Sequence, residues 1–227
     1  MQKRRVVVTG LGCITPLGNS VDSFWSSLLD GKSGASEISN FDTTTMPVKF
    51  SCSVKNFNVE NYFDTKEVRK YDLFMQYGLA AGIDAVKDSG LEDSNINKEN
   101  VGVAIGSGIG GLPNIENTHA IYSKSGPRRI SPFFVPSSII NMISGNLSIK
   151  YGYKGPNISI VSACTTGTHN IGESFRHIQH SYADVMICGG AEMASSPLGV
   201  GGFASARALS TRNDDPTKAS RPWDIDR

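Results

Sequence analysis

The sequence predicts an α/β fold built on one parallel or mixed sheet, and three observations support this class. Short apolar or β-branched runs end in small residues at 5–9, 101–105 and 157–162. Patterns with the 3.6-residue period of a helix lie between these runs. Strand, helix and strand also follow one another within about 30 residues over 157–188, as in a βαβ unit with parallel strands and a right-handed crossover.

The N-terminal part predicts one strand, one helix and an irregular stretch. Residues 5–9 form a short β-branched run that is typical of a buried strand. Asn19 or Ser20 is placed to cap the helix that follows. The apolar side chains of this helix share one face: Val21, Phe24, Trp25, Leu28 and Leu29. We expect irregular structure over 41–63, with one strand near 48–54.

The rest of the chain alternates helices and strands. In order, we expect a helix over 66–89 ended by Gly90, a strand over 101–105, a helix over 136–150 with Pro136 in its first turn, a strand over 157–162, a helix over 165–181 and a strand over 184–188.

Composition excludes several classes of protein. Of 227 residues, 39% are hydrophobic and 19% are charged, so the chain can form a packed core. Lys and Arg number 22 and Asp and Glu 21, a balance that argues against a protein that coats nucleic acid. No apolar run is long enough for a membrane helix or a signal peptide, so we expect a cytoplasmic protein with no membrane or nucleic-acid partner.

The cysteines and histidines give no sign of a metal site. Cys13, Cys52, Cys164 and Cys188 are widely spaced and form no C-x-x-C pair, which excludes a zinc ribbon or a dithiol motif. We expect free thiols in a reducing compartment. The spacing of His177 and His180 could suit a metal, but no third ligand is evident; we therefore predict no metal.

The glycine-rich run that follows the strand over 101–105 resembles a dinucleotide fingerprint. Gly106, Gly108 and Gly111 match its letters, but Pro113 follows at once and the polar stretch 114–126 holds no strand. We therefore expect no nucleotide cofactor, and we interpret these glycines as positions where backbone segments pack closely beside a pocket.

Cys164 is the candidate nucleophile. It lies between the apolar run 157–162 and a helix that begins with hydroxyl residues, so it is placed at the carboxyl end of a strand and at a helix N-terminus. A helix N-terminus favours the thiolate, and nearby backbone N–H groups could stabilise an oxyanion. Cys13, Cys52 and Cys188 are interpreted as inert.

No base accompanies this nucleophile in the sequence. His169 is five residues after Cys164, about 140° around a helix, so we expect it to bond locally. His177 and His180 lie at the far end of the same helix, and His119 has no assignable role.

Several blocks of the chain, taken together, resemble the β-ketoacyl-[acyl-carrier-protein] synthases of type II fatty acid synthesis, most closely their synthase II branch. The blocks are Arg4–Gly12, Ile105–Gly111, Ser131–Pro136, Ser162–Thr165, Gly189–Glu192 and Ala208–Thr211. This resemblance implies that residues 1–227 are the N-terminal half of a thiolase-like fold, with a five-stranded mixed sheet and helices on both faces, in a homodimeric enzyme.

The resemblance also implies an activity. Such enzymes accept an acyl chain on a cysteine, here Cys164, and condense it with malonyl-acyl-carrier protein, releasing CO₂. The two histidines and one lysine that complete the family's site would lie beyond Arg227, so we expect these 227 residues alone not to condense. No cofactor is implied.

Two further groups of residues are carried over from the family. The resemblance places Ile109, Phe134 and Phe203 along the acyl channel. It assigns six basic residues to the face that binds the acidic carrier protein with its phosphopantetheine arm: Lys66, Arg69, Lys70, Arg128, Arg129 and Arg207. The first three share one face of the helix expected over 66–89 because they are spaced i, i+3, i+4.

Two related functions stay open. One is a thiolase that acts on coenzyme A esters, and the other is a non-catalytic synthase-like partner subunit. The synthase-like blocks and the basic face favour the synthase over the thiolase, and the presence of Cys164 argues against the non-catalytic subunit.

Overall fold

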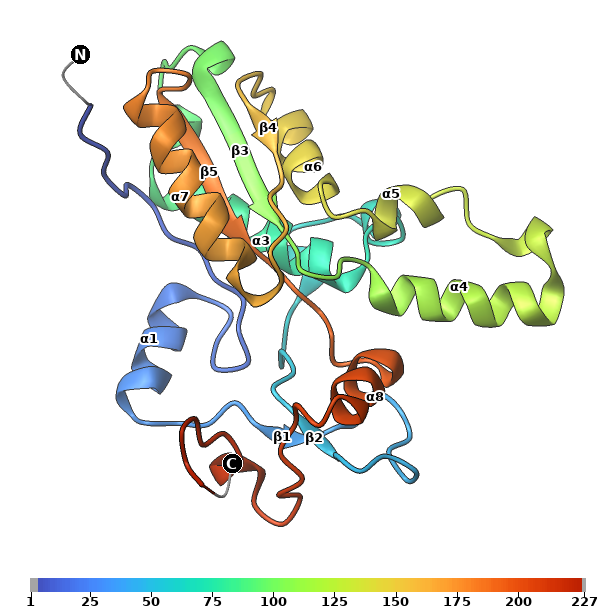
Figure 1. The fold of residues 1–227 in the computed structure, drawn as a ribbon. Coiled ribbons are helices and arrows are strands. Elements are labelled where there is room, and N and C mark those ends of the chain that lie inside the picture. The colour runs from blue at the N-terminus through green and yellow to red at the C-terminus, as the bar shows by residue number, and fades with distance from the viewer. Residues whose placement is uncertain (1–3, 226–227) are drawn as a thin grey trace. The chain divides into compact units, whose positions relative to one another are not determined.

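The computed structural model describes residues 4–225, which form two compact units (Figure 1). The first unit comprises residues 4–13 and 58–193, and the second comprises 14–57 and 194–225. No helix among the described residues has both the length and the apolar character that crossing a bilayer requires.

The first unit is built on a three-stranded parallel sheet in the order β4–β3–β5. Its strands are β3 (Val101–Gly106), β4 (Asn157–Ile158) and β5 (Val185–Gly190). The central strand β3 is buried along its whole length, and Ile105 pairs with Gly189 of β5. The parallel pairing predicted for the βαβ unit is confirmed.

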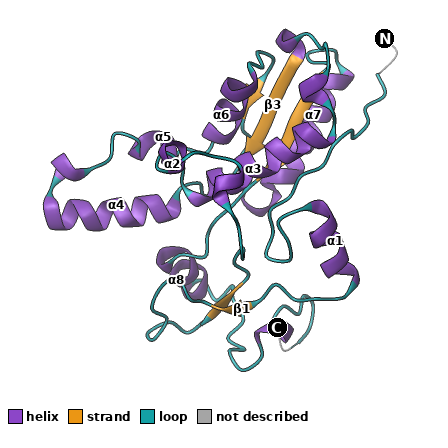
Figure 2. Cartoon of the chain, turned by 180° about the vertical axis from the view of Figure 1, so that it is seen from behind, coloured by secondary structure: helices purple, strands orange, loops and turns teal. Residues whose placement is uncertain are grey.

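Helices cover both faces of this sheet, as Figures 1 and 2 show. α3 (Leu73–Asp88) and α6 (Met142–Tyr151) pack on one face, and α7 (Thr166–Gln179) packs on the other. Apolar side chains of α3, α6 and the sheet form the main core, including Phe74, Met75, Leu79, Ile83, Val101, Val103, Ile105, Ile143 and Leu147.

The strand predicted over 157–162 is shorter in the structure, because side chains replace its ladder after Ile158. The Ser144 hydroxyl of α6 accepts the Ile105 N–H at 2.8 Å and lies 2.9 Å from the Ile158 carbonyl oxygen, to which it can donate. The hydroxyl therefore lies between the Ile105 N–H of β3 and the Ile158 carbonyl of β4, and it relays the hydrogen bond that these two groups would otherwise make directly. Beyond this point, the Asn170 side chain pairs with the backbone of Ile160.

The five-stranded mixed sheet is wrong for this structure, which has sheets of three and two strands in its described part. The run 5–9 belongs to no strand, and Val8 is 80% exposed. Gly10 and Gly12 instead lie directly against α3. A Cβ on Gly12 would come 2.0 Å from the Ala81 carbonyl oxygen, so the close approach to α3 requires glycine there.

The single helix expected over 66–89 is two helices, α2 (Thr65–Val68) and α3. Asp72 causes the break: its backbone is extended and its carboxylate accepts the Phe74 N–H at 3.3 Å, which caps the start of α3. Gly90 has a φ of +66°, as expected of the residue that ends this helix.

The helix expected over 136–150 is also divided, into α5 (Phe134–Ser138) and α6. Ile139 between them is extended, and the Ser138 carbonyl accepts the Gly111 N–H at 3.1 Å instead of continuing a helix. Pro136 is therefore the third residue of a short helix and not the start of a long one.

A helix that the sequence did not indicate follows the glycine-rich run. α4 (Leu112–Ser125) begins directly after Gly111, and Pro113 lies in its first turn, where the missing N–H has no cost. The interpretation that Pro113 argues against a helix at this point is wrong.

The second unit is small. It holds α1 (Val21–Leu29), α8 (Pro197–Ser205) and an antiparallel pair of strands, β1 (Ser36–Glu37) and β2 (Phe50–Ser51). Ser20 caps α1 as predicted, and β2 is a short form of the strand expected near 48–54. Ile38, Val48 and Val200 form its core.

Candidate active site

Cys164 lies in the turn that joins the sheet to α7. A 3-10 turn, η5 (Ala163–Thr165), precedes α7 directly, and Cys164 is solvent-exposed. Ala163 has a φ of +52°, a left-handed conformation that residues with a Cβ rarely adopt. Strain of this kind persists only where the surroundings hold it, and it is concentrated at functional sites.

The glycine-rich run packs against this turn. A Cβ on Gly108 would lie 3.2 Å from the Ala163 carbonyl oxygen and 2.8 Å from a carboxylate oxygen of Glu192, so the approach depends on glycine. A Cβ on Gly106 would come 2.4 Å from the Ile160 carbonyl oxygen. The expected close backbone packing is confirmed.

Glu192 holds the glycine-rich run in place, a role that the sequence analysis missed. Its carboxylate accepts the Ser107 hydroxyl at 2.9 Å and the Ile109 N–H at 3.0 Å. The available signal was an acidic residue just past the carboxyl end of a strand, the edge where sites in α/β sheets gather.

The histidines of the described chain have partners or positions away from the thiol. The His169 Nδ1 lies 2.6 Å from the Ser162 Oγ, so the expected local bond is confirmed. The His177 and His180 rings pack near Tyr182, and His119 is exposed on α4. Among residues 4–225, no cluster of His, Cys, Asp and Glu is suited to a metal ion.

Two of the remaining cysteines, Cys13 and Cys188, differ from Cys164 in being partly buried. Burial raises the pKa of Cys188 in β5, and burial together with the nearby Asp84 carboxylate raises the pKa of Cys13. Cys52 is exposed and belongs to the second unit.

Two of the three predicted channel residues lie on elements that pack together. Ile109, in the glycine-rich run, is 39% exposed, and Phe134 is the first residue of α5. The run reaches α5 through Gly111, whose Cβ would come 2.6 Å from the Ser137 carbonyl oxygen. Phe203 is in α8 of the second unit and is 44% exposed.

The basic residues are exposed and belong to three segments. Lys66 is in α2, and Arg69 and Lys70 follow it within the same turn, so they do not lie on one long helix. The Lys70 Nζ lies 5.6 Å from the centre of the Phe133 ring, a cation–π contact.

This contact links the α2 turn to the segment that carries the next basic pair. Arg128 and Arg129 form the turn η4 (Pro127–Arg129), four to five residues before Phe133. Arg207 is in the second unit, just after α8, with a φ of +55°.

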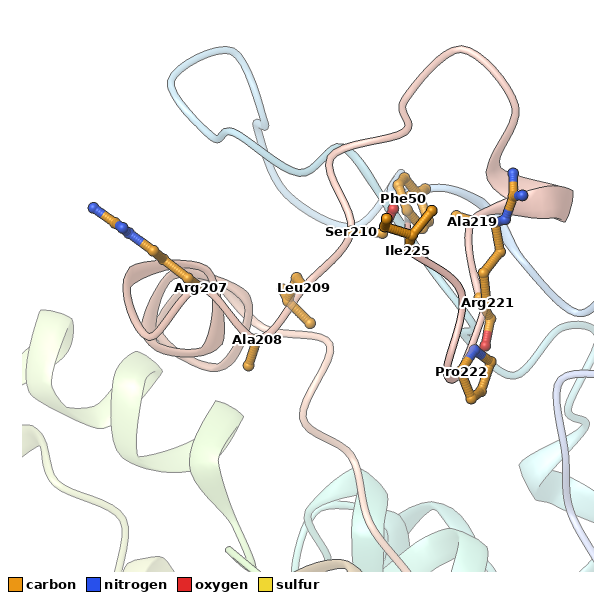
Figure 3. A pocket seen from close by; sticks show the side chains of 10 residues that line it. Phe50, Arg207, Ala208, Leu209, Ser210, Ala219, Arg221, Pro222 and Ile225 are labelled. Atoms are coloured by element: carbon orange, nitrogen blue, oxygen red, sulfur yellow. The ribbon is translucent and has the colours of Figure 1, made fainter. Parts of the chain in front are cut away.

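The second unit also contains a cavity of about 670 Å³ between the segment after α8 and the segment near residue 221. In Figure 3 the Arg207 side chain extends away from the other lining residues. The Arg221 guanidinium is bound to the Asp224 carboxylate at 2.7 Å, so its charge is already paired.

An exposed cysteine at a strained strand-to-helix turn, backed by a glycine-rich run, defines a class of α/β domain suited to covalent catalysis by a thiol. The comparisons with known proteins identify the family. A family model described as "Beta-ketoacyl synthase, N-terminal domain" matches residues 3–226, and the chain belongs to that family.

Curated relatives carry the name 3-oxoacyl-[acyl-carrier-protein] synthase 2. The chain is 59% identical over 227 residues to the one from Vibrio cholerae, covering 100% of this chain and 55% of the relative. It is 46% identical to the one from Synechocystis sp., again covering 100% of this chain and 55% of the relative. The chain thus spans about half the length of the curated relatives it matches. The resemblance to the synthase II branch is confirmed.

Solved structures agree with this assignment. A β-ketoacyl synthase from Burkholderia phymatum superimposes with a TM-score of 0.87 at 28% identity, over 100% of this chain and 55% of that one. A ketosynthase in complex with its type II PKS acyl-carrier protein gives 0.77 at 27% identity, over 92% of this chain and 58% of that one. The thiolase-like α/β class is confirmed, although the five-stranded mixed sheet predicted for it is not.

Proposed function

We propose that this chain supplies the acyl-accepting half of a β-ketoacyl-acyl-carrier-protein synthase, with Cys164 as the nucleophile. The observation that carries the proposal is the exposed Cys164 in a turn with a strained Ala163, in a chain of the synthase family.

The first step is transfer of an acyl chain. The Cys164 Sγ, as thiolate, attacks the thioester carbonyl carbon of acyl-phosphopantetheine and forms a tetrahedral oxyanion. As an early residue of η5, Cys164 has no intrahelical acceptor for its own N–H, which is therefore available to this oxyanion. The intermediate collapses as the carbon–sulfur bond to pantetheine breaks, and the pantetheine thiolate leaves and takes up a proton.

The second step is condensation. Malonyl-carrier protein loses CO₂, and the electron pair of the broken bond forms an enolate. Its carbon attacks the Cys164 thioester, which releases β-ketoacyl-carrier protein and the Cys164 thiolate. The enolate needs hydrogen-bond donors. His169, the histidine nearest in sequence, is bonded to Ser162 through its Nδ1, and His177, His180 and His119 lie at the far end of α7 and in α4. We therefore expect these 227 residues to accept acyl groups without condensing them.

The proposed partner is an acyl-carrier protein, bound through its acidic surface. The exposed α2 turn and η4 provide five positive charges on two segments that the Lys70–Phe133 contact connects. The complex of a related ketosynthase with a carrier protein supports this proposal. Homodimer formation and the channel roles of Ile109, Phe134 and Phe203 stay predictions.

A comparison of carriers tests the substrate class. The chain is mixed with the same acyl group on acyl-carrier protein or on coenzyme A, and protein-bound acyl is measured over time, with Cys164→Ala as the control. We expect faster transfer from the carrier protein and none to Cys164→Ala. Transfer from coenzyme A alone would favour the thiolase, and no transfer from either carrier would contradict the proposal.

A further inference from the structure

The segment that leads into the Cys164 turn makes no ladder bonds with the strand beside it. The ladder between β3 and β4 ends at Ile158, although the end of β3 still lies close to Ile160. Backbone N–H and C=O groups that leave solvent need other partners. Side chains of α7 supply them.

Asn170 replaces the missing ladder bonds with one side-chain amide. Its Oδ1 accepts the Ile160 N–H at 3.0 Å, and its Nδ2 donates to the Ile160 carbonyl at 3.0 Å and to the Thr166 carbonyl at 2.9 Å. Asn170 is fully buried, so water cannot substitute for these bonds. One side chain therefore satisfies both backbone groups of Ile160.

Thr166 makes a second connection closer to the cysteine. Its Oγ1 accepts the Ser162 N–H at 3.0 Å, and the residue is 4% exposed. Asn170 and Thr166 together fasten residues 160–162, before the turn, to α7, after it. We call this pair of side chains the clasp.

The clasp encloses the strained residue. Ala163, with its φ of +52°, and Cys164 lie between the two fastened segments. A left-handed alanine relaxes unless its flanks are held. Because the bonds of the clasp fix both flanks, they account for the survival of this conformation.

We propose that Asn170 and Thr166 are positioning residues for Cys164. The hydrogen bonds of these two side chains hold the thiol at the N-terminus of α7. The role of this positioning in catalysis rests on the proposed function. Its effect on the reactivity of the Cys164 thiol does not. Without the clasp, Ala163 relaxes and Cys164 moves from its place at the positive end of the α7 dipole.

The experiment compares alkylation rates within one molecule. Iodoacetamide labelling of the full 227-residue chain is followed by peptide mass mapping, and the rate at Cys164 is divided by the rate at Cys52, an exposed thiol in the other unit. The slow labelling of Cys188 reports that the first unit remains folded. The variants are Asn170→Ala and Thr166→Val.

Asn157→Ala is the matched control. Asn157 also fastens the same chain segment to a helix, donating to the Ser144 carbonyl at 3.1 Å and to the Ser148 Oγ at 2.6 Å, but it does so at the other end of the segment. General loss of the anchoring of this segment would affect this variant as well, whereas loss of the positioning of the turn would not.

We expect the Cys164-to-Cys52 ratio to fall about two- to fivefold in both clasp variants and to stay unchanged in Asn157→Ala. Acyl transfer should show a lower kcat with an unchanged KM for the carrier protein, because the basic segments are untouched. An unchanged ratio in folded clasp variants, or an equal fall in the control, would overturn the proposal. Fast labelling of Cys188 in both clasp variants would also overturn it, since the pair would then support the whole unit.

Failure of the proposed function gives a different result. If the wild-type chain accepts no acyl group while the ratio still falls in the clasp variants, the positioning of the thiol stands and the assignment as an acyl acceptor does not.

Discussion

Replacement of Ser144 by alanine removes the hydroxyl that relays the ladder between β3 and β4. Ser144 is fully buried, and its loss leaves the Ile105 N–H without its partner at 2.8 Å. An unpaired buried donor costs about 1–3 kcal/mol. The hydroxyl proton can serve only one of two carbonyls, Ile105 or Ile158, and losing that bond adds about 0.5–1.5 kcal/mol.

We therefore expect Ser144→Ala to lower the free energy of unfolding by about 1.5–4.5 kcal/mol. For a chain of this length, each kcal/mol changes Tm by about 2–4 °C. Urea denaturation followed by far-UV circular dichroism measures the loss. Ser148→Ala is the control on the same helix, because its hydroxyl accepts one bond near the surface, from Asn157. Equal stability of the two variants, within about 0.5 kcal/mol, would refute the relay.

Three further predictions concern charge and reactivity. Burial raises the pKa of Asp72 in the folded protein, although backbone N–H bonds act in the opposite direction. The stability that Asp72 contributes is therefore present below the pKa it has in the unfolded chain, and it is lost as the pH rises through the pKa it has in the folded protein. Urea unfolding should therefore show a larger deficit for Asp72→Asn at pH 4 than at pH 7. Cys164 should be alkylated faster than Cys188 at neutral pH, because burial of Cys188 raises its pKa and lowers its thiolate fraction; the reverse order would contradict the site. Lys70→Glu with Arg128→Glu should weaken carrier-protein binding about tenfold at low salt and less at high salt, where the Debye length is shorter; calorimetry showing equal Kd values would exclude this surface.

The sequence contained enough information to predict the central βαβ unit. The apolar run at 101–105 and the strand–helix–strand spacing predict parallel strands, and both are present. The position of Cys164 at a helix start is local information, which is why it could be predicted.

The shortened strand and the divided helices depend on residues far apart in the chain. β4 ends early because Ser144, 14 residues before Ile158, relays its ladder. The break before α3 depends on Asp72, which also accepts the Asn114 N–H at 2.8 Å, 42 residues away. Neither contact leaves a periodic pattern in the sequence.

The geometry of the site could not be predicted from the sequence either. The sequence does not indicate the positive φ of Ala163, because glycine and asparagine are the residues expected in that conformation. The resemblance to a family named the nucleophile, but only the contacts of Glu192 and Asn170 show how the turn and the glycine-rich run are held.

The central claim is that Cys164 accepts the acyl chain, and mapping the acylated residue tests it most directly. The chain is incubated with acyl-carrier protein, digested, and analysed by mass spectrometry with and without hydroxylamine, which cleaves thioesters. We predict a hydroxylamine-labile acyl group on the peptide that contains Cys164, and none on the peptides of Cys13, Cys52 or Cys188. An acyl group on any of those three in the folded protein, with Cys164 unmodified, would contradict the account.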